Sequence, residues 1–490
     1  MEVDDLPTTS GSSRAITGGA GLTAPLADVG SGGVGLGYRL EVDRLIAGRV
    51  RAGTIAFSEM IAEAVPSHAD DLPPAVRVML DAGMPVVPHG VKLGLGDATP
   101  PSPERLRVLA HAVDVLGAPL VSEHVAFVRV GSQEIGHLTP VPRTRASLAV
   151  VVDNVRRTMA HLPVPLAVEN AAALFDWPHN DLTEAQFLTA VLEQTDAWLL
   201  LDLANVAVTA HNTRLDPAAL LGALPMERVA YVHVAGGEER DGLRHDTHTH
   251  SLWPELLDLV AELASAAPDA PVLLERDGRF PPAHALEAEL DLLAAARERG
   301  RHGPATTPAR ERERFGEGRR TIGQQDGPST DGELAGERTA LAERHHSLTA
   351  YLVTAGPAPD GFPDAPLLAA RAALRQKRRG EVAGRLPALA AALGPTFAVE
   401  FDRYADRFPP PSHTGTDVGA FVEALRRHIP SSTLNEAAAE EMLHTVADVD
   451  PGRRRLRRLT SVALVRQQHR SGTVWLWRWR SGSRVHVIHR

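Results

Sequence analysis

The chain has 490 residues, a formal net charge of −10 at pH 7, 43% hydrophobic residues and no cysteine. The hydrophobic content supports a large core and excludes a chain that is disordered throughout. The negative charge argues against nucleic-acid binding through bulk electrostatics, and the lack of cysteine removes disulfides and thiolate ligands. No apolar run approaches the roughly 20 residues of a membrane-spanning helix, and the acidic N-terminus lacks an export-signal pattern. We therefore expect a cytoplasmic protein.

Residues 1–32 are rich in Gly, Ser, Thr and Ala without periodicity, and we expect a disordered tail. Between 33 and 299, β-rich runs alternate with helical patterns. The expected strands are 34–39, 54–60, 85–89, 119–124, 164–170, 198–205, 229–237 and 271–278. The expected helices are 102–117, 145–162, 183–194, 253–266 and 283–299, with Ser102 and Thr183 as N-caps of two of them. Eight alternating units predict an α/β protein with an eight-stranded β/α (TIM) barrel.

The second half of the chain changes character twice. Residues 300–338 contain almost no large apolar side chains, which is typical of a flexible linker. Helical patterns return after that, so we expect a second, mainly helical domain over 339–490.

The last forty residues hold 11 arginines and no acidic residue. Trp475, Trp477 and Trp479 alternate there, which predicts a strand with its tryptophans on one face, paired across a turn at 469–472. Three roles stay open for this tail. It could bind nucleic acid by stacking and phosphate contacts, form a basic edge that resists aggregation, or add a peptide strand to its own edge.

Histidines and carboxylates recur at the ends of the expected strands and directly after the seventh. In chain order they are His89, His124, Glu169, Asp202, His233, Asp246, His248 and Glu275. A single such residue more often caps a strand or satisfies a hydrogen bond. In a β/α barrel, however, the C-terminal ends of all strands open on one face, so we expect these eight residues to converge there.

Four of these residues are carboxylates, and their mutual repulsion carries the chemical argument. At about 5 Å and an effective dielectric of 20, each like-charge pair costs about 3 kcal/mol. Such a cluster needs protons or cations, and four carboxylates balance two divalent metals. The ligand atoms are nitrogen and oxygen only, which suits zinc, iron or manganese. The sequence therefore predicts a multinuclear metal site, with no catalytic residue assigned beyond it.

Several short segments, in this order and spacing over about residues 33–280, carry a resemblance. They are GVGLGYR, FSEMIAEA, PHGVKLGLG, SEHVAF, AVENAA, LLLDLANV, VHVAGG, the DTH of HDTHTH, and LLERDG. The chain resembles the multinuclear non-heme iron-dependent oxidative enzymes, the family of the methanobactin-biosynthesis oxidase, within the xylose-isomerase-like barrels. The resemblance implies that the eight residues bind two or three irons. It also implies dioxygen as co-substrate and a ribosomally made precursor peptide, modified at cysteine, as substrate.

Four further residues are candidates for ligands or for hydrogen bonding to the ligands: Glu59, Asn170, Asn205 and His211. Hydrogen bonding to a ligand is the preferred role of Glu59. The segment 374–411 resembles helical partner proteins encoded beside these oxidases, which are thought to present the precursor peptide. A purely structural helical domain is the alternative. If the domain recognises peptide, the three alternating tryptophans are candidates for binding it.

Two other functions stay open. One keeps the barrel and its metals but makes the protein a sugar isomerase or phosphodiesterase that uses zinc or manganese. The other is a non-catalytic metal-binding or regulatory protein that touches DNA through its arginine tail. Iron with oxygen-dependent activity would favour the oxidase, colourless zinc the isomerase, and DNA retention independent of the barrel the regulator. The oligomeric state is not predicted.

Overall fold

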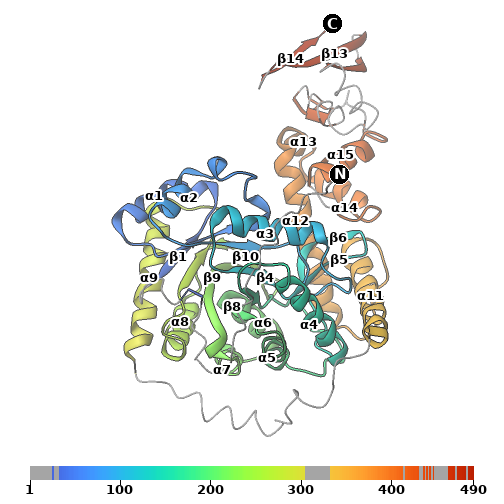
Figure 1. Ribbon diagram of the computed structural model, residues 1–490. Coiled ribbons are helices and arrows are strands. Elements are labelled where there is room, and N and C mark those ends of the chain that lie inside the picture. The colour runs from blue at the N-terminus through green and yellow to red at the C-terminus, as the bar shows by residue number, and fades with distance from the viewer. Residues whose placement is uncertain are drawn as a thin grey trace, which may run out of the picture.

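The computed structural model describes residues 25–26, 33–303, 331–411 and 414–429, short pieces of 434–445, and the backbone of three strands between 462 and 489. Its centre is a closed ring of eight parallel strands wrapped by helices (Figure 1). These strands are β1 (Val34–Gly37), β2 (Ser58–Ile61), β3 (Val86–Gly90), β4 (Val121–His124), β7 (Leu166–Glu169), β8 (Trp198–Asp202), β9 (Val229–Arg240) and β11 (Val272–Glu275). Pairing of β9 with both β8 and β11 closes the ring. The predicted β/α barrel is confirmed.

Helices cover the outside of the barrel because its strands are buried on both faces. They are α1 (Asp43–Ala52), α2 (Pro74–Asp81), α3 (Pro103–Leu116), α4 (Arg145–Met159), α5 (Glu184–Thr195), α6 (Leu203–Thr213), α7 (Pro217–Gly222), α8 (Pro254–Ala266) and α9 (Ala283–His302). Ser102 and Thr183 cap α3 and α5 as expected, each accepting a backbone N–H of its first turn. Within the described residues, no helix has the length and apolar character needed to cross a membrane.

The inside of the barrel is filled by an apolar layer. Its members are Leu26, Phe57, Val87, Leu120, Ala167, Trp198, Leu200, Ala230, Tyr231 and Leu273. Side chains two residues apart on a strand point to the same face. Val87 is therefore followed on the inner face by His89, and Leu200 by Asp202. The predicted ligands thus form the next layer up, at the C-terminal end. Leu26 is 1% exposed although it falls in the predicted tail 1–32, whose other residues except Pro25 lie outside the described residues.

Three strands at the rim were not predicted. β5 (Ala126–Val130) and β6 (Gln133–Pro140) form an antiparallel hairpin after β4. β10 (Leu243–His250) folds back antiparallel along β9 in a segment for which the sequence patterns predicted no element. The turn between β9 and β10 is Asp241–Gly242, both with positive φ, and this pair is a strong hairpin signal that the sequence contained.

The first C-terminal helix packs on the barrel. α11 (Asp331–Val353) lies against α4 (Figure 1), and Leu348 and Leu352 belong to the barrel's hydrophobic cluster. His345 stacks on Phe127 of β5 with ring centroids 3.8 Å apart. The helix is therefore packed as part of the barrel, although a separate domain was expected from residue 339.

The predicted linker 300–338 is too long at both ends. α9 continues to His302, α11 begins at Asp331, and 304–330 lie outside the described residues. The first turns of α11 are polar, so the sequence pattern did not identify them as helix. Arg338 fixes them to the barrel by donating to Asp153 Oδ2 at 2.5 Å and to Asn154 Oδ1 at 2.8 Å.

The remaining C-terminal helices have a core of their own, so the mainly helical prediction holds. They are α12 (Asp364–Arg385), α13 (Pro387–Leu393), α14 (Pro395–Ala405) and α15 (Thr414–Leu425). Phe397, Phe401 and Phe421 are buried at the centre of this second cluster, with ring centroids 5.3 to 5.4 Å apart for the contacts to Phe421.

The tail forms a three-stranded sheet of β12 (Val462–His469), β13 (Gly472–Ser481) and β14 (Arg484–His489). His469 pairs with Gly472, so β12 and β13 pair on the two sides of the predicted turn. Trp475, Trp477 and Trp479 lie on β13, which is the central strand. The interpretation of this strand as a free edge is wrong, because the unpredicted strand β14 pairs with its second side.

Candidate metal centre

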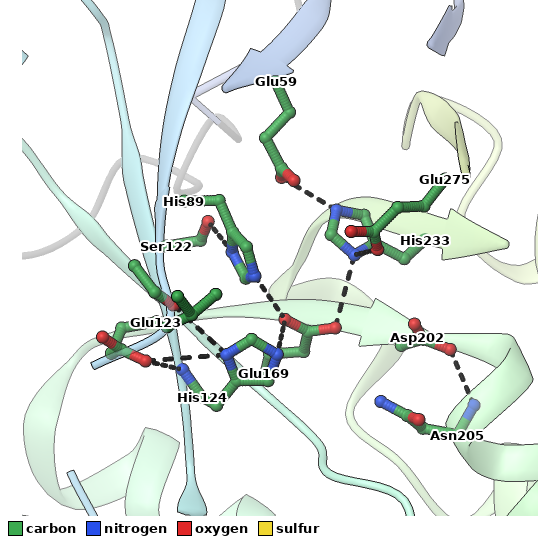
Figure 2. Close-up of polar contacts among 12 residues, drawn as sticks. Glu59, His89, Ser122, Glu123, His124, Glu169, Asp202, Asn205, His233 and Glu275 are labelled. Carbon is green, nitrogen blue, oxygen red and sulfur yellow. Dashed lines mark hydrogen bonds and ion pairs between the residues drawn. The ribbon is translucent and has the colours of Figure 1, made fainter. Parts of the chain in front are cut away.

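The eight predicted ligands come from six barrel strands and from β10. His89, His124, Glu169, Asp202 and Glu275 lie in the last two residues of β3, β4, β7, β8 and β11, while His233 lies inside the long strand β9. Asp246 and His248 reach the rim on β10. Figure 2 shows the strand-borne ligands pointing toward one another. The structure therefore brings these eight residues together at the rim.

Three groups of ligand atoms follow one another along the rim, and within each group the atoms lie within 4.8 Å of one another. They are His89–His124–Glu169, Glu169–Asp202–His233 and Asp202–His248–Glu275. Glu169 belongs to the first two groups and Asp202 to the last two. A carboxylate has two oxygens, so each shared residue can serve two neighbouring cations.

Glu169 is the central link. Its Oε2 lies 3.0 Å from His124 Nε2 and 3.4 Å from His89 Nε2. Its other oxygen, Oε1, lies 3.3 Å from His233 Nδ1. The two oxygens therefore face different histidines, as a carboxylate between two metal positions would.

The third group is more open. Glu275 Oε2 lies 3.3 Å from His233 Nδ1 and 3.2 Å from His248 Nδ1. Asp246 belongs to none of the three groups, but its Oδ1 lies 2.6 Å from His248 Nε2. Its side chain is 22% exposed, so it is the most accessible of the eight predicted ligands.

Several buried ligand atoms approach each other closely without forming a hydrogen bond. Among the described residues, no hydrogen bond reaches Glu169 Oε2, Asp202 Oδ2, His233 Nδ1, Asp246 Oδ1 or His248 Nε2. Atoms that point at a common centre rather than at each other have the orientation that metal ligands need. The residues present therefore fit a metal ion.

The electrostatics of the cluster give the same picture. Burial disfavours the charged form of His124, but Glu169 and Glu123 outweigh it and raise its pKa to about 9. Burial also raises the pKa of Glu169, but His124, His233 and His89 lower it to about 2. Burial and the neighbouring Asp246 raise the pKa of Asp202 to about 8. Without a metal, a proton on His124 helps to balance the carboxylates, and a cation would replace it.

The four additional candidates have different positions. Glu59 Oε2 accepts a hydrogen bond from His233 Nε2 at 2.8 Å. Asn170 holds the backbone of Asp202 through both ends of its amide, and Asn205 donates its own N–H to Asp202 Oδ1 at 2.7 Å. This last bond starts α6, which is why the strand expected to reach 205 ends at 202. His211 lies exposed on α6 and belongs to none of the three groups.

Sequence reasoning missed several residues that support the ligands. Arg39 donates to Glu275 Oε1 at 3.0 Å, and Glu123 Oε1 accepts the backbone N–H of His124 at 2.8 Å. Ser122 and Tyr231 lie two positions before His124 and His233 on the same inner faces. The period of two in a strand was the signal that could have identified them.

A cleft of about 1040 Å³ opens above the ligands. His89, His124, Asp246, His248 and Glu275 line its floor. Its walls include the seven consecutive residues 134–140 of β6, residues of α12, and Pro410 and Pro411. The C-terminal region therefore contributes directly to the approach to the candidate centre.

Comparisons with known proteins agree with this division of the chain. Residues 33–298 match the model of the family described as RiPP precursor modification enzyme MbnB/TglH/ChrH, where RiPP denotes a ribosomally made, modified peptide. Residues 342–427 match the family described as SCO6045-like, C-terminal domain. A UPF0276 protein of Streptomyces avermitilis is 39% identical over 448 residues, which cover 83% of this chain and 90% of that protein. A UPF0276 protein of Pseudomonas aeruginosa is 35% identical, covering 44% of this chain and 76% of its own length.

Among solved structures, a xylose isomerase domain protein from Alicyclobacillus acidocaldarius is 14% identical with a TM-score of 0.36. It covers 54% of this chain and 99% of its own. A 3-keto-D-glucoside 4-epimerase from E. coli is also 14% identical, with a TM-score of 0.35, and covers 54% of this chain and 98% of its own. The family match spans the whole barrel and all eight candidate ligands, and the chain belongs to the MbnB/TglH/ChrH family of RiPP precursor modification enzymes.

Proposed function

We propose that the protein uses two or three irons and dioxygen to oxidise a ribosomally made precursor peptide at a cysteine. The observation that carries the proposal is the row of three ligand groups joined by Glu169 and Asp202. Shared carboxylates favour neighbouring metal ions over a single ion. Nitrogen and oxygen ligands with no thiolate suit iron, and the family supplies the class of substrate.

In this proposal the chain's own residues hold the metals and orient the substrate. Neutral imidazoles of His89, His124, His233 and His248 would coordinate the metals, so metal binding requires a deprotonated ring nitrogen on each of them. Bound iron would supply electron transfer to dioxygen, which is reduced while the peptide loses hydrogen. Arg39 holds Glu275, and the buried position of Glu169 keeps water away from the inner part of the centre.

The C-terminal region is proposed to recognise the peptide. Residues of α12 and the pair Pro410–Pro411 line the same cleft as the candidate ligands, so a peptide bound there would touch both parts of the chain. The arginine-rich tail favours an acidic peptide segment. Trp475, Trp477 and Trp479 remain candidates for peptide binding, with β12 and β14 as the edges of the sheet.

The test of this function is metal identity combined with oxygen dependence. The metal-free protein is loaded anaerobically with Fe²⁺, Zn²⁺ or Mn²⁺ and mixed with a cysteine-containing peptide encoded by a short neighbouring reading frame. We expect a change in peptide mass only with iron and oxygen, and none in Asp202→Ala. The matched control is His211→Ala, which removes an exposed histidine from α6, the helix that Asp202 caps, and should leave the reaction unchanged. Equal turnover with zinc in the absence of oxygen would contradict the proposal and favour an isomerase-like or hydrolytic reaction.

A further inference from the structure

A buried chain of hydrogen bonds runs beneath the ligands from His233 to His89. His233 Nε2 lies 2.8 Å from Glu59 Oε2, and Tyr231 Oη lies 2.6 Å from the same oxygen. Tyr231 Oη also lies 2.7 Å from Ser122 Oγ, which lies 2.8 Å from His89 Nδ1. Figure 2 shows the two ends of this chain, at Glu59 and at Ser122. None of the five side chains is more than 2% exposed.

The direction of each bond follows from the number of protons. An ionised Glu59 can only accept, so His233 Nε2–H and Tyr231 O–H both donate to it. The single hydroxyl proton of Tyr231 is then used, so Ser122 O–H donates to Tyr231 Oη. Ser122 Oγ in turn accepts the proton of His89 Nδ1. With Glu59 in its carboxylate form, this is the direction in which every donor of the chain has one acceptor.

The direction of these hydrogen bonds determines which ring nitrogen each histidine presents to the candidate metal centre. His89 carries its proton on Nδ1 and presents Nε2, which faces Glu169 Oε2 at 3.4 Å. His233 carries its proton on Nε2 and presents Nδ1, which faces Glu169 Oε1 and Glu275 Oε2, each at 3.3 Å. The two histidines therefore use opposite ring nitrogens, and they belong to different ligand groups that share Glu169.

We propose that Glu59, Tyr231 and Ser122 form a positioning network that selects these opposite nitrogens and couples the two metal positions joined by Glu169. The inference rests on the metal centre of the proposed function. Tyr231 is the central member, because it touches neither metal position but connects the partners of both histidines. Removing its hydroxyl leaves Ser122 without an acceptor and Glu59 with one donor fewer. The chain of hydrogen bonds that fixes the proton positions on His89 and His233 is then broken.

The test uses Co²⁺ and Zn²⁺ added to the metal-free full-length protein. We expect Tyr231→Phe to weaken binding at both positions by roughly 10–100-fold, the usual effect of losing a group that holds a ligand. Glu59→Gln should act mainly on the position of His233, and Ser122→Ala mainly on that of His89. In the Zn²⁺-loaded protein, nitrogen-15 spectra of the histidine rings should show the proton of His89 on Nδ1 and that of His233 on Nε2. Tyr231→Phe should mix these tautomers.

Two matched controls separate positioning from general loss of stability. Tyr404 Oη donates to Asp417 Oδ1 at 2.6 Å in the C-terminal helices, so Tyr404→Phe removes a bond of equal length between the same kinds of group. Ser58 Oγ donates to Leu36 O at 2.6 Å beside Glu59, so Ser58→Ala removes a buried hydroxyl from the neighbouring position. Neither control should change metal affinity or the tautomers.

Unchanged Co²⁺ affinity and unchanged tautomers in a folded Tyr231→Phe would overturn the inference. If that variant does not fold, the smaller change Ser122→Ala decides the question by the same two readouts. A parent protein that binds neither ion overturns the metal centre and the network together. A parent that binds both ions through the network but shows no iron- and oxygen-dependent reaction contradicts the proposed function alone.

Discussion

Two regions of the molecule bury histidines with few ordinary hydrogen bonds, and they treat the charge of the imidazole in opposite ways. At the barrel rim, burial lowers the pKa of His124, but Glu169 and Glu123 raise it to about 9. Where α11 packs on β5, burial, helped by Arg344, lowers the pKa of His345 to about 3. His345 stacks on Phe127, and neither of its nitrogens has a hydrogen-bond partner among the described residues.

The difference shows that burial alone does not identify a functional histidine. Among carboxylates, a buried imidazole completes a site that attracts cations. Between aromatic rings, it behaves as a flat apolar side chain. His345 stacks on Phe127, whereas each rim histidine has a ring nitrogen within 3.4 Å of a carboxylate oxygen. The partners of a buried histidine, rather than its burial, distinguish the two regions.

The largest effect is expected from Glu169→Ala. This residue serves two ligand groups, so its loss should lower metal affinity at both positions. The decrease should be at least the roughly 10–100-fold that follows from removing a residue that only hydrogen-bonds to a ligand. Asp246→Ala is the comparison within the rim, since Asp246 lies outside all three groups and is partly exposed. Equilibrium dialysis with Zn²⁺ measures both. Equal losses in the two variants would contradict the central position of Glu169.

A large effect on stability, but not on metal binding, is expected where α11 packs on the barrel. Leu348 of α11 is 0% exposed in the barrel's cluster, so Leu348→Ala should lower the free energy of unfolding by about 2–5 kcal/mol. Leu368 of α12 is 56% exposed, and Leu368→Ala should change stability by less than about 0.5 kcal/mol. Denaturant titration gives these values. Metal bound per folded molecule should be the same in both variants, and a loss in Leu348→Ala would mean that α11 shapes the centre.

The lowered pKa of His345 should contribute to the pH dependence of the free energy of unfolding. Its pKa in the folded state, about 3, lies below the ordinary value of 6.5, so the unfolded chain binds the proton more tightly between these values. The contribution is complete above pH 6.5 and is lost as the pH falls toward 3, at no more than about 1.4 kcal/mol per pH unit. His345→Leu should remove this part of the acid sensitivity, and His346→Leu, at an exposed position, should not. Identical acid dependence in the parent and His345→Leu would show that His345 is not held neutral.

The smallest effect on metal content and association is expected from cleavage of the chain between α9 and α11. Within the predicted linker, residues 304–330 are expected to be the first site of limited proteolysis, because their polar composition offers no core. Since Leu348 and Leu352 pack into the barrel's cluster, the two fragments should stay together in gel filtration and keep their metal. First cleavage within 85–280 would contradict the predicted boundary, and separation of the fragments would contradict the α11 contact.

The barrel and the convergence of its candidate ligands could be predicted because both follow from local patterns. Apolar runs of strand length mark each strand, and the polar residue at each end marks the rim. The strands β6 and β10 were missed because polar segments such as LRHDTHTH lack the apolar pattern of a barrel strand. The apolar strand β5 begins only two residues after the end of β4 and was not separated from it. The packing of α11 could not be predicted, because it depends on contacts such as Arg338 with Asp153 across 185 residues.

The positioning network could be predicted only in part. Glu59 was proposed from its place near a strand end, and it does accept a hydrogen bond from His233. Tyr231 and Ser122 occupy inner-face positions that the period of two assigns to the layer below the ligands. What the sequence could not give is that Tyr231 from β9 reaches Ser122 on β4, on another side of the ring.

The most direct test of the central claim is the metal content of three full-length proteins after anaerobic loading with Fe²⁺ and gel filtration. The parent should retain roughly two ions per chain, because the ligands are buried and shared between neighbouring groups. His233→Ala should lose most of that metal, since His233 faces both Glu169 and Glu275. His345→Leu, which removes a buried histidine from the other region, should retain it in full. Equal metal in all three proteins, or none in the parent, would contradict the assignment of the barrel rim as the metal centre.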